Sequence, residues 1–172
     1  VTVSTSLNSG QASTIPSRGN ARLAAVTATT GDVVVNAVNG EVTGVGVAAA
    51  NLEATGGKVT VNGGTLARLG IVKSGGDTGL TADSITVATA NVGGALSLDA
   101  DVGNATLGTG TVTGTSLIKA TGDASVGSLT SGGPSTLTAG GLASATTLLK
   151  TTGAAGNILV SGATVQLAKV ES

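Results

Sequence analysis

The chain of 172 residues has no phenylalanine, tryptophan, tyrosine, methionine, cysteine or histidine. The absence of cysteine and histidine excludes disulfides, thiolate metal sites, thiolate nucleophiles and a general base that titrates near neutral pH. The absence of aromatic rings excludes a stacking platform for nucleic acid bases, and a net charge of −1 leaves no basic patch. We therefore expect no nucleic acid partner, no cofactor and no enzymatic activity.

Charge and long apolar segments are also scarce. Only 10% of the residues are charged, against about 25% in a typical chain. No apolar run approaches the roughly 18 residues of a membrane-spanning helix, so we expect no membrane span. The chain begins without an initiator methionine or a signal peptide, which leads us to expect an internal fragment of a longer protein.

Small residues take the place of the missing ones. Glycine supplies 29 residues, and the 40% of apolar residues are mostly valine, leucine, alanine and isoleucine. A compact globule usually has aromatic residues in its core, because each ring buries a large area. A core without them is expected to be thin and to consist of small aliphatic side chains in layers.

One short line of sequence recurs along the chain. The stretch "VTATTGDVVV", which begins at Val26, returns as "LEATGGKVTV" from Leu52. Weaker copies, mostly about 19 residues apart, begin at Leu80, Leu98, Ile118, Leu137 and Leu149. The intervals after Val26 and Leu52 are longer and the last interval is shorter. The pattern indicates a repeat of about 19 residues, with either irregular turns or two registers of one motif.

The residues within each repeat alternate as they do in a β-strand. Valines alternate with polar residues in "GDVVVNAV" and "GKVTVNGG", and frequent glycine opposes a helix. Short strands at a constant period predict an all-β fold, a parallel β-helix (β-solenoid) with coils of about 19 residues stacked about 4.8 Å apart. We expect Val, Leu, Ile and Ala inside, with Thr, Ser, Asn and charges outside. Glycines at the corners are expected to adopt conformations that other residues avoid.

The repeat also sets the expected domain organisation. We expect a single β-solenoid segment over residues 1–172, a fragment of a longer shaft. Residues 1–25 are expected to be an irregular start, because the stretch "LNSGQASTIPSRGN" departs from the rhythm and contains Pro16.

A few polar residues are candidates for chemistry. Asp99 and Asp101 are two residues apart, as in a paired-carboxylate glycosidase, but a solvated strand face explains them more simply. The stretch around Asp77, "SGGDTGL", loosely resembles calcium-binding glycine-aspartate repeats but occurs once. Threonine-rich stretches suggest an ice-binding array, but the threonines hold no fixed place. Arg18 and Arg22 are the candidate ligand contacts, with sulfated glycans as the partner.

The recurring order apolar-x-Ala-Thr-x-Gly-x-Val-x-Val, at Val26, Leu52 and more loosely Ile118, resembles the repeats of filamentous haemagglutinin-type adhesins. These are exoproteins of two-partner secretion in Gram-negative bacteria. The resemblance covers about Val26 to Val170. It implies a right-handed helix that is exported through an outer-membrane partner and displayed on or released from the cell surface.

The resemblance implies a structural and adhesive function in virulence, namely attachment to host cells through a receptor or glycan bound by the parent protein. Two alternatives remain open. The same kind of shaft carries contact-dependent growth-inhibition toxins, whose toxic part lies at the far end. A β-helical polysaccharide-active enzyme is the other alternative.

Overall fold

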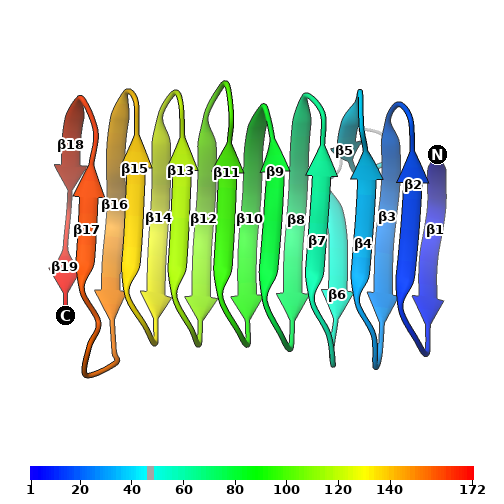
Figure 1. Cartoon of the computed structure of the whole chain (residues 1–172), viewed down its shortest axis with the longest axis horizontal. Coiled ribbons are helices and arrows are strands. Elements are labelled where there is room, and N and C mark those ends of the chain that lie inside the picture. Colours follow the sequence, from blue (N-terminus) through cyan, green and yellow to red (C-terminus); the bar gives the residue numbers. More distant parts are fainter. Residues whose placement is uncertain (46–48) are drawn as a thin grey trace.

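A computed structural model of the chain is a right-handed parallel β-helix (Figure 1). The structure describes residues 1–45 and 49–172. The coils stack side by side into an elongated rod, with the N-terminus at one end and the C-terminus at the other (Figure 1). The described residues form strands and turns and contain no helix. The predicted all-β solenoid is confirmed, with coils of close to 20 residues.

Eight short strands form one wall of the rod, called here the short sheet. They pair in parallel in the order β17-β15-β13-β11-β9-β7-β4-β2. Their bounds are β2 (Ser13–Ser17), β4 (Val33–Ala37), β7 (Val59–Gly63), β9 (Thr78–Ala82), β11 (Leu96–Ala100), β13 (Ser116–Ala120), β15 (Ser135–Ala139) and β17 (Ile158–Ser161).

Within residues 1–45 and 49–172, eleven strands form the opposite wall, called here the long sheet. Their bounds are β1 (Thr2–Ser9), β3 (Ala21–Ala28), β5 (Glu41–Thr43), β6 (Ala50–Ala54), β8 (Leu66–Ser74), β10 (Ser84–Val92), β12 (Ala105–Val112), β14 (Ala124–Ser131), β16 (Leu142–Thr151), β18 (Thr164–Leu167) and β19 (Val170–Glu171). A full-length strand of this sheet bends in its middle, where two successive residues face outward, as Ala88 and Thr89 do in β10. Each full coil therefore has three outer faces, one on the short sheet and two on the long sheet.

The pairing explains the irregular intervals between copies of the repeated line. Val26 and Leu52 are paired neighbours in the long sheet, whereas Leu80 and Leu98 are paired neighbours in the short sheet. The interval from Leu52 to Leu80 therefore joins two different walls of the rod. Both alternatives left open by the sequence are present, because the motif occurs in two registers and the coils also differ in length.

One coil of the described rod is interrupted. Thr43 pairs with Arg22, and Asn51 pairs with Ala25. Two residues lie between Arg22 and Ala25 on β3, whereas seven residues lie between Thr43 and Asn51. The long-sheet strand of this coil is accordingly described as two strands, β5 and β6. Residues 46–48 lie within this segment and outside the described residues, so part of the irregular interval after Val26 is not placed.

The core consists of columns of aliphatic side chains that run along the rod. One inward column of the short sheet contains Ile15, Val35, Val61, Leu80, Leu98, Ile118 and Leu137, all buried. At the end of the same strands the inward residue is mostly alanine, as at Ala82 and Ala100, where the coil turns sharply. Layers of similar side chains fill this narrow interior, so aromatic rings are not needed.

Hydroxyl groups inside the rod correct the expectation that serine and threonine lie outside. Eight serine and threonine residues of the described part of the chain are buried, among them Ser116, Ser131 and Ser135. The Ser131 hydroxyl lies 2.6 Å from the Ser135 hydroxyl and donates to the Gly133 carbonyl at 2.7 Å, and Ser116 donates to Ser135 at 2.9 Å. The corner accepts these polar groups because each has a partner, and no buried side-chain donor or acceptor of the described residues lacks one.

The corner glycines serve a different purpose from the one expected. Outside residues 44–48, no glycine of the described chain has a φ in the left-handed region. Close approach between coils is the reason for glycine instead. A Cβ at Gly132 would lie 2.0 Å from the Thr113 carbonyl oxygen of the previous coil. Backbone hydrogen bonds link successive turns here, as between Gly132 N–H and Val112 O at 2.8 Å, so no room remains for a side chain.

The expectation of an irregular start over residues 1–25 is wrong. β1, β2 and the beginning of β3 occupy this stretch and pair with the next coil like the strands that follow. Pro16 fits because it lies on the outer surface of β2, at the edge of the short sheet described here. Ile15 on the same strand is buried, so the strand keeps its inward aliphatic position despite the proline.

Candidate functional site

Ion pairs between neighbouring coils involve every lysine of the chain. Five pairs lie within the described residues, with Nζ–O distances of 2.5–3.0 Å. They are Lys58–Asp77, Lys73–Glu53, Lys119–Asp99, Lys150–Glu171 and Lys169–Glu171. Most join residues on successive coils at the outer surface. Such exposed pairs contribute little stability each, and they leave the lysines neutralised.

These pairs shift the ionisation of the partners. The Lys73 ammonium group donates to Glu53 and lowers the pKa of that carboxyl group. Glu171 accepts hydrogen bonds from Lys150 and Lys169, which lower its pKa to about 2. Asp99 accepts from Lys119 and raises the pKa of that ammonium group. The carboxylates of Glu53 and Glu171 are thus held in their charged form by interactions between or within coils.

The three arginines differ from the lysines. Arg18, Arg22 and Arg68 are exposed, and none of the ion pairs of the described residues includes an arginine. Arg18 lies in the turn between β2 and β3, and Arg22 follows on β3. Sequence reasoning therefore selected two unpaired cations on one coil and missed the third, Arg68, which lies more than 40 residues later in the chain.

The pairing of strands places Arg22 and Arg68 in one column. Arg22 pairs with Thr43 on β5, and Val42 pairs with Ala67, so Thr43 stands beside Arg68 on β8. The column Arg22–Thr43–Arg68 runs along the rod on the first outer face of the long sheet, and we call it the arginine column. Its two guanidinium groups arise two coils apart, which corresponds to about 10 Å of backbone separation.

One carboxylate lies near this column. Glu41 begins β5, two residues before Thr43 on the same strand, and is partly exposed. Its backbone N–H donates to the Asn20 Oδ1 atom at 3.1 Å, which fixes the corner next to Arg22. No ion pair joins Glu41 to an arginine. The arginine column is therefore flanked by a carboxylate that does not neutralise it.

The structure places the two carboxylates of Asp99 and Asp101 in different surroundings. Asp99 lies on β11, where Lys119 donates to both of its oxygens at 3.0 and 3.2 Å. Asp101 lies in the turn after that strand and is exposed, and its backbone carbonyl accepts a hydrogen bond from Thr121. Neither of the two surface hollows described below includes them. Asp99 is thus occupied by Lys119, and the Asp101 side chain is exposed outside both hollows.

Asp77 is also occupied by interactions within the chain. Its Oδ1 atom accepts the Ala95 N–H at 3.0 Å, and its Oδ2 atom lies 3.0 Å from the Lys58 Nζ atom. The hydrogen bond from Ala95 and the contact with Lys58 lower the pKa of Asp77. Among the described residues no three or more Asp or Glu side chains come together as a metal site.

Corner asparagines and aspartates form a feature that sequence reasoning missed. Asp32 accepts the Lys58 N–H at 2.8 Å, Asn104 accepts the Asp123 N–H at 2.8 Å, and Asp123 accepts the Leu142 N–H at 2.8 Å. In each case the donor belongs to the next coil. The signal available in the sequence was the recurrence of Asn or Asp directly before a strand, which indicates a coil-to-coil link in this fold.

Threonine rows on the outer surface are short. In β10, β12 and β14, Thr89, Thr109 and Ser128 form one row, and Thr111 and Thr130 stand together in the next. On either side the rows end at larger residues, among them Ile71 of β8. The structure thus places the threonines in columns, over three coils rather than along the whole rod.

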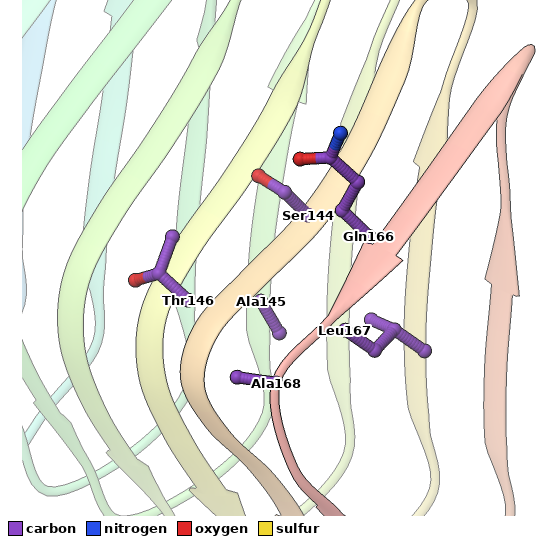
Figure 2. Close-up of a pocket in the computed structure, with 6 residues that line it drawn as sticks. All are labelled: Ser144, Ala145, Thr146, Gln166, Leu167 and Ala168. Atoms are coloured by element: carbon purple, nitrogen blue, oxygen red, sulfur yellow. The ribbon is translucent and has the colours of Figure 1, made fainter.

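Two shallow hollows lie on the long sheet. Figure 2 shows the first, between β16 and β18, where Ser144 and Gln166 are paired neighbours. Its lining residues are Ser144, Ala145, Thr146, Gln166, Leu167 and Ala168. The second is lined by Ala25, Val26, Thr27, Asn51, Leu52, Glu53 and Ile71. Only one ionisable side chain, that of Glu53, lines either hollow, and Lys73 already pairs with it. Neither lining contains a pair of groups suited to acid–base chemistry.

The comparisons with known proteins identify no relative. The chain matches no protein-family model, no curated protein and no solved structure. Among the described residues there is no helix that is long and apolar enough to cross a membrane. The fold is therefore assigned from the strand pairing, as a stack of parallel β-coils in which the inner columns are aliphatic and the outer columns carry the chain's charges.

Proposed function

We propose that this chain is a segment of the shaft of a secreted bacterial surface adhesin, of the filamentous haemagglutinin type, that mediates attachment to host cells. The observation that carries the proposal is the parallel pairing of strands from β1 to β19 over the described residues, which makes the segment a rod. A rod of this kind supports a binding region at a distance from the cell. The role is mechanical and requires no catalytic group.

The composition agrees with the proposal. Nearest-neighbour coils supply both the hydrogen bonds and the aliphatic contacts, so stability is a sum of similar layers and the shaft can be long. A chain without cysteine cannot form disulfides that would block export in an unfolded state. The motif copies at Val26 and Leu52, which resemble the repeats of these adhesins, are paired neighbours in the long sheet. An outer-membrane secretion partner would export the parent protein.

Surface exposure and attachment test the proposal together. Antibodies against the chain should label intact cells of the source bacterium, and loss of the parent protein should reduce attachment to epithelial cells. Loss of the outer-membrane partner should abolish the surface label. Labelling only after the cells are permeabilised would contradict the proposal. Unchanged attachment, combined with loss of killing of neighbouring bacteria, would instead support a toxin shaft.

A further inference from the structure

We infer that the arginine column of β3, β5 and β8 binds a linear acidic polysaccharide that carries one carboxylate per disaccharide. The inference goes beyond the proposed function, because a shaft that only separates two parts of a protein needs no ligand of its own. It also extends the sequence prediction, which named Arg18 and Arg22 but not Arg68 and Thr43.

The first argument is the contrast between the two kinds of cation. All five lysines pair with carboxylates, and these pairs mostly link successive coils. The three arginines make no such pair and are exposed. Each unpaired guanidinium group keeps five N–H donors, whose planar arrangement matches a carboxylate in a bidentate fashion. The free cations of this sparsely charged chain are therefore gathered on its first coils and suited to carboxylates.

The second argument is the spacing within the arginine column. Arg22 and Arg68 project from positions two coils apart, about 10 Å along the rod. This separation is about the length of two linked sugar rings. A polysaccharide that lies along the rod with one carboxylate on every second sugar would meet one guanidinium group per charge. Thr43, which stands between the arginines, offers a hydroxyl group to the intervening sugar.

The third argument is Glu41, because it disfavours ligands of higher charge density. This carboxylate lies two residues from Thr43 on β5 and is not paired with an arginine. A sulfated chain with several anionic groups per disaccharide would place charges near Glu41 and be repelled. A polymer with one carboxylate per disaccharide avoids most of this repulsion.

Other ligands fit the arginine column less well. Neither hollow includes a residue of the column, so a single small anion would bind only through exposed contacts, which are weak. A polymer gains from binding two or three sites at once. Nucleic acid would find no aromatic ring on which to stack, because the chain has none.

The test uses the whole chain and hyaluronan decasaccharide, in which every second sugar is a uronate. With only three arginines, the side-chain Nε–Hε signals in a nitrogen–proton NMR spectrum give one probe for each guanidinium group. We expect saturable shifts of the Arg22 and Arg68 signals. The variant Arg22→Gln/Arg68→Gln should bind about tenfold more weakly, because two exposed charge-assisted contacts are lost.

Matched control variants distinguish the effect of the arginine column on binding from the effect of net charge. Lys119→Gln/Lys150→Gln has the same net charge as the double arginine variant and should bind as the wild type does. Glu41→Gln should bind dextran sulfate more tightly with a smaller effect on hyaluronan. Amide signals of each variant report whether it is folded.

Three outcomes would overturn the inference. They are the absence of shifts at physiological salt, equal shifts with the carboxyl-methylated decasaccharide, and tighter binding of dextran sulfate than of hyaluronan to the wild type. The last outcome would return the ligand to the sulfated class. None of these results depends on where the parent protein is located, so they are independent of the attachment test.

Discussion

The first region of the rod, residues 1–75, and the second region, residues 76–172, share one interior but differ in their outer charge. The first region carries five basic and three acidic side chains, and the second carries three basic and six acidic ones. All three arginines and the interrupted coil belong to the first region. In the second region every lysine pairs with a carboxylate.

The inner columns take no part in this difference. The column from Ile15 to Leu137 passes from one region to the other without a change in chemistry. Inward residues are constrained by the layers above and below them, whereas outward residues meet solvent. The inward residues therefore specify the fold, whereas the outer residues are free to differ between coils. Function is best sought where outer charged residues of neighbouring coils form no ion pairs.

The largest expected effect concerns this shared interior. Val61→Ala in the first region and Val126→Ala in the second each remove two buried methyl groups from positions that are fully buried. Each should lower the free energy of unfolding by about 1.5–3 kcal/mol. Chemical denaturation measures both. If Val61→Ala lowered the free energy of unfolding much less than Val126→Ala, the two regions would not share one interior. That result would show that the interior near the interrupted coil is less tightly packed.

A corner glycine gives the next effect. Gly132→Ala places a Cβ against the Thr113 carbonyl oxygen, and overpacking of this kind costs about 1–3 kcal/mol. Gly79→Ala is the control, because nothing lies within 4 Å of a Cβ there, and it should be neutral or slightly stabilising. Thermal unfolding distinguishes the two. Equal effects would show that glycine is selected at corners for a reason other than close approach.

The paired carboxylates make the end of the second region sensitive to acid. The pKa of Glu171 is about 2 in the folded chain, against 4.5 for an ordinary glutamate. A lowered carboxyl pKa stabilises the folded chain above pH 4.5, and this stabilisation is lost as the pH falls toward 2. The protection of the β18 and β19 amides against exchange, relative to an unfolded chain, should therefore fall as the pH is lowered from about 4.5 toward about 2. Glu171→Gln should remove this dependence, and Arg22→Gln should not alter it.

The smallest expected effect is a gain in affinity when the arginine column is extended into the second region. Thr106 on β12 is exposed and lies two coils beyond Arg68, because Arg68 pairs with Thr86 and Thr86 pairs with Thr106. Thr106→Arg should bind the hyaluronan decasaccharide about threefold more tightly than the wild type, since one more exposed contact is gained. Thr111→Arg, on the other outer face of β12, is the control and should leave the affinity unchanged.

Much of the fold was predictable because it depends on local alternation. The strands β4 and β7 follow from the alternating valines of "GDVVVNAV" and "GKVTVNGG", which face inward as expected. The irregular start was predicted wrongly, because Pro16 and the polar residues around it obscured the strand pattern in which Ile15 is the inward residue. The inward Ser131 was missed as well, since its hydroxyl group is satisfied by a carbonyl and a second hydroxyl that only the turn brings near.

The sequence by itself determined that the chain is a stack of short β-strands, since a period of two within a repeat of about 19 residues has no other regular solution. Only the tertiary structure decided which residues become neighbours on the surface. Arg22 and Arg68 are far apart along the chain, and the insertion before β6 shifts the repeat between them. Backbone hydrogen bonding between strands, and not a fixed number of residues, sets which residues are neighbours across coils. The arginine column therefore exists only when the coils are stacked.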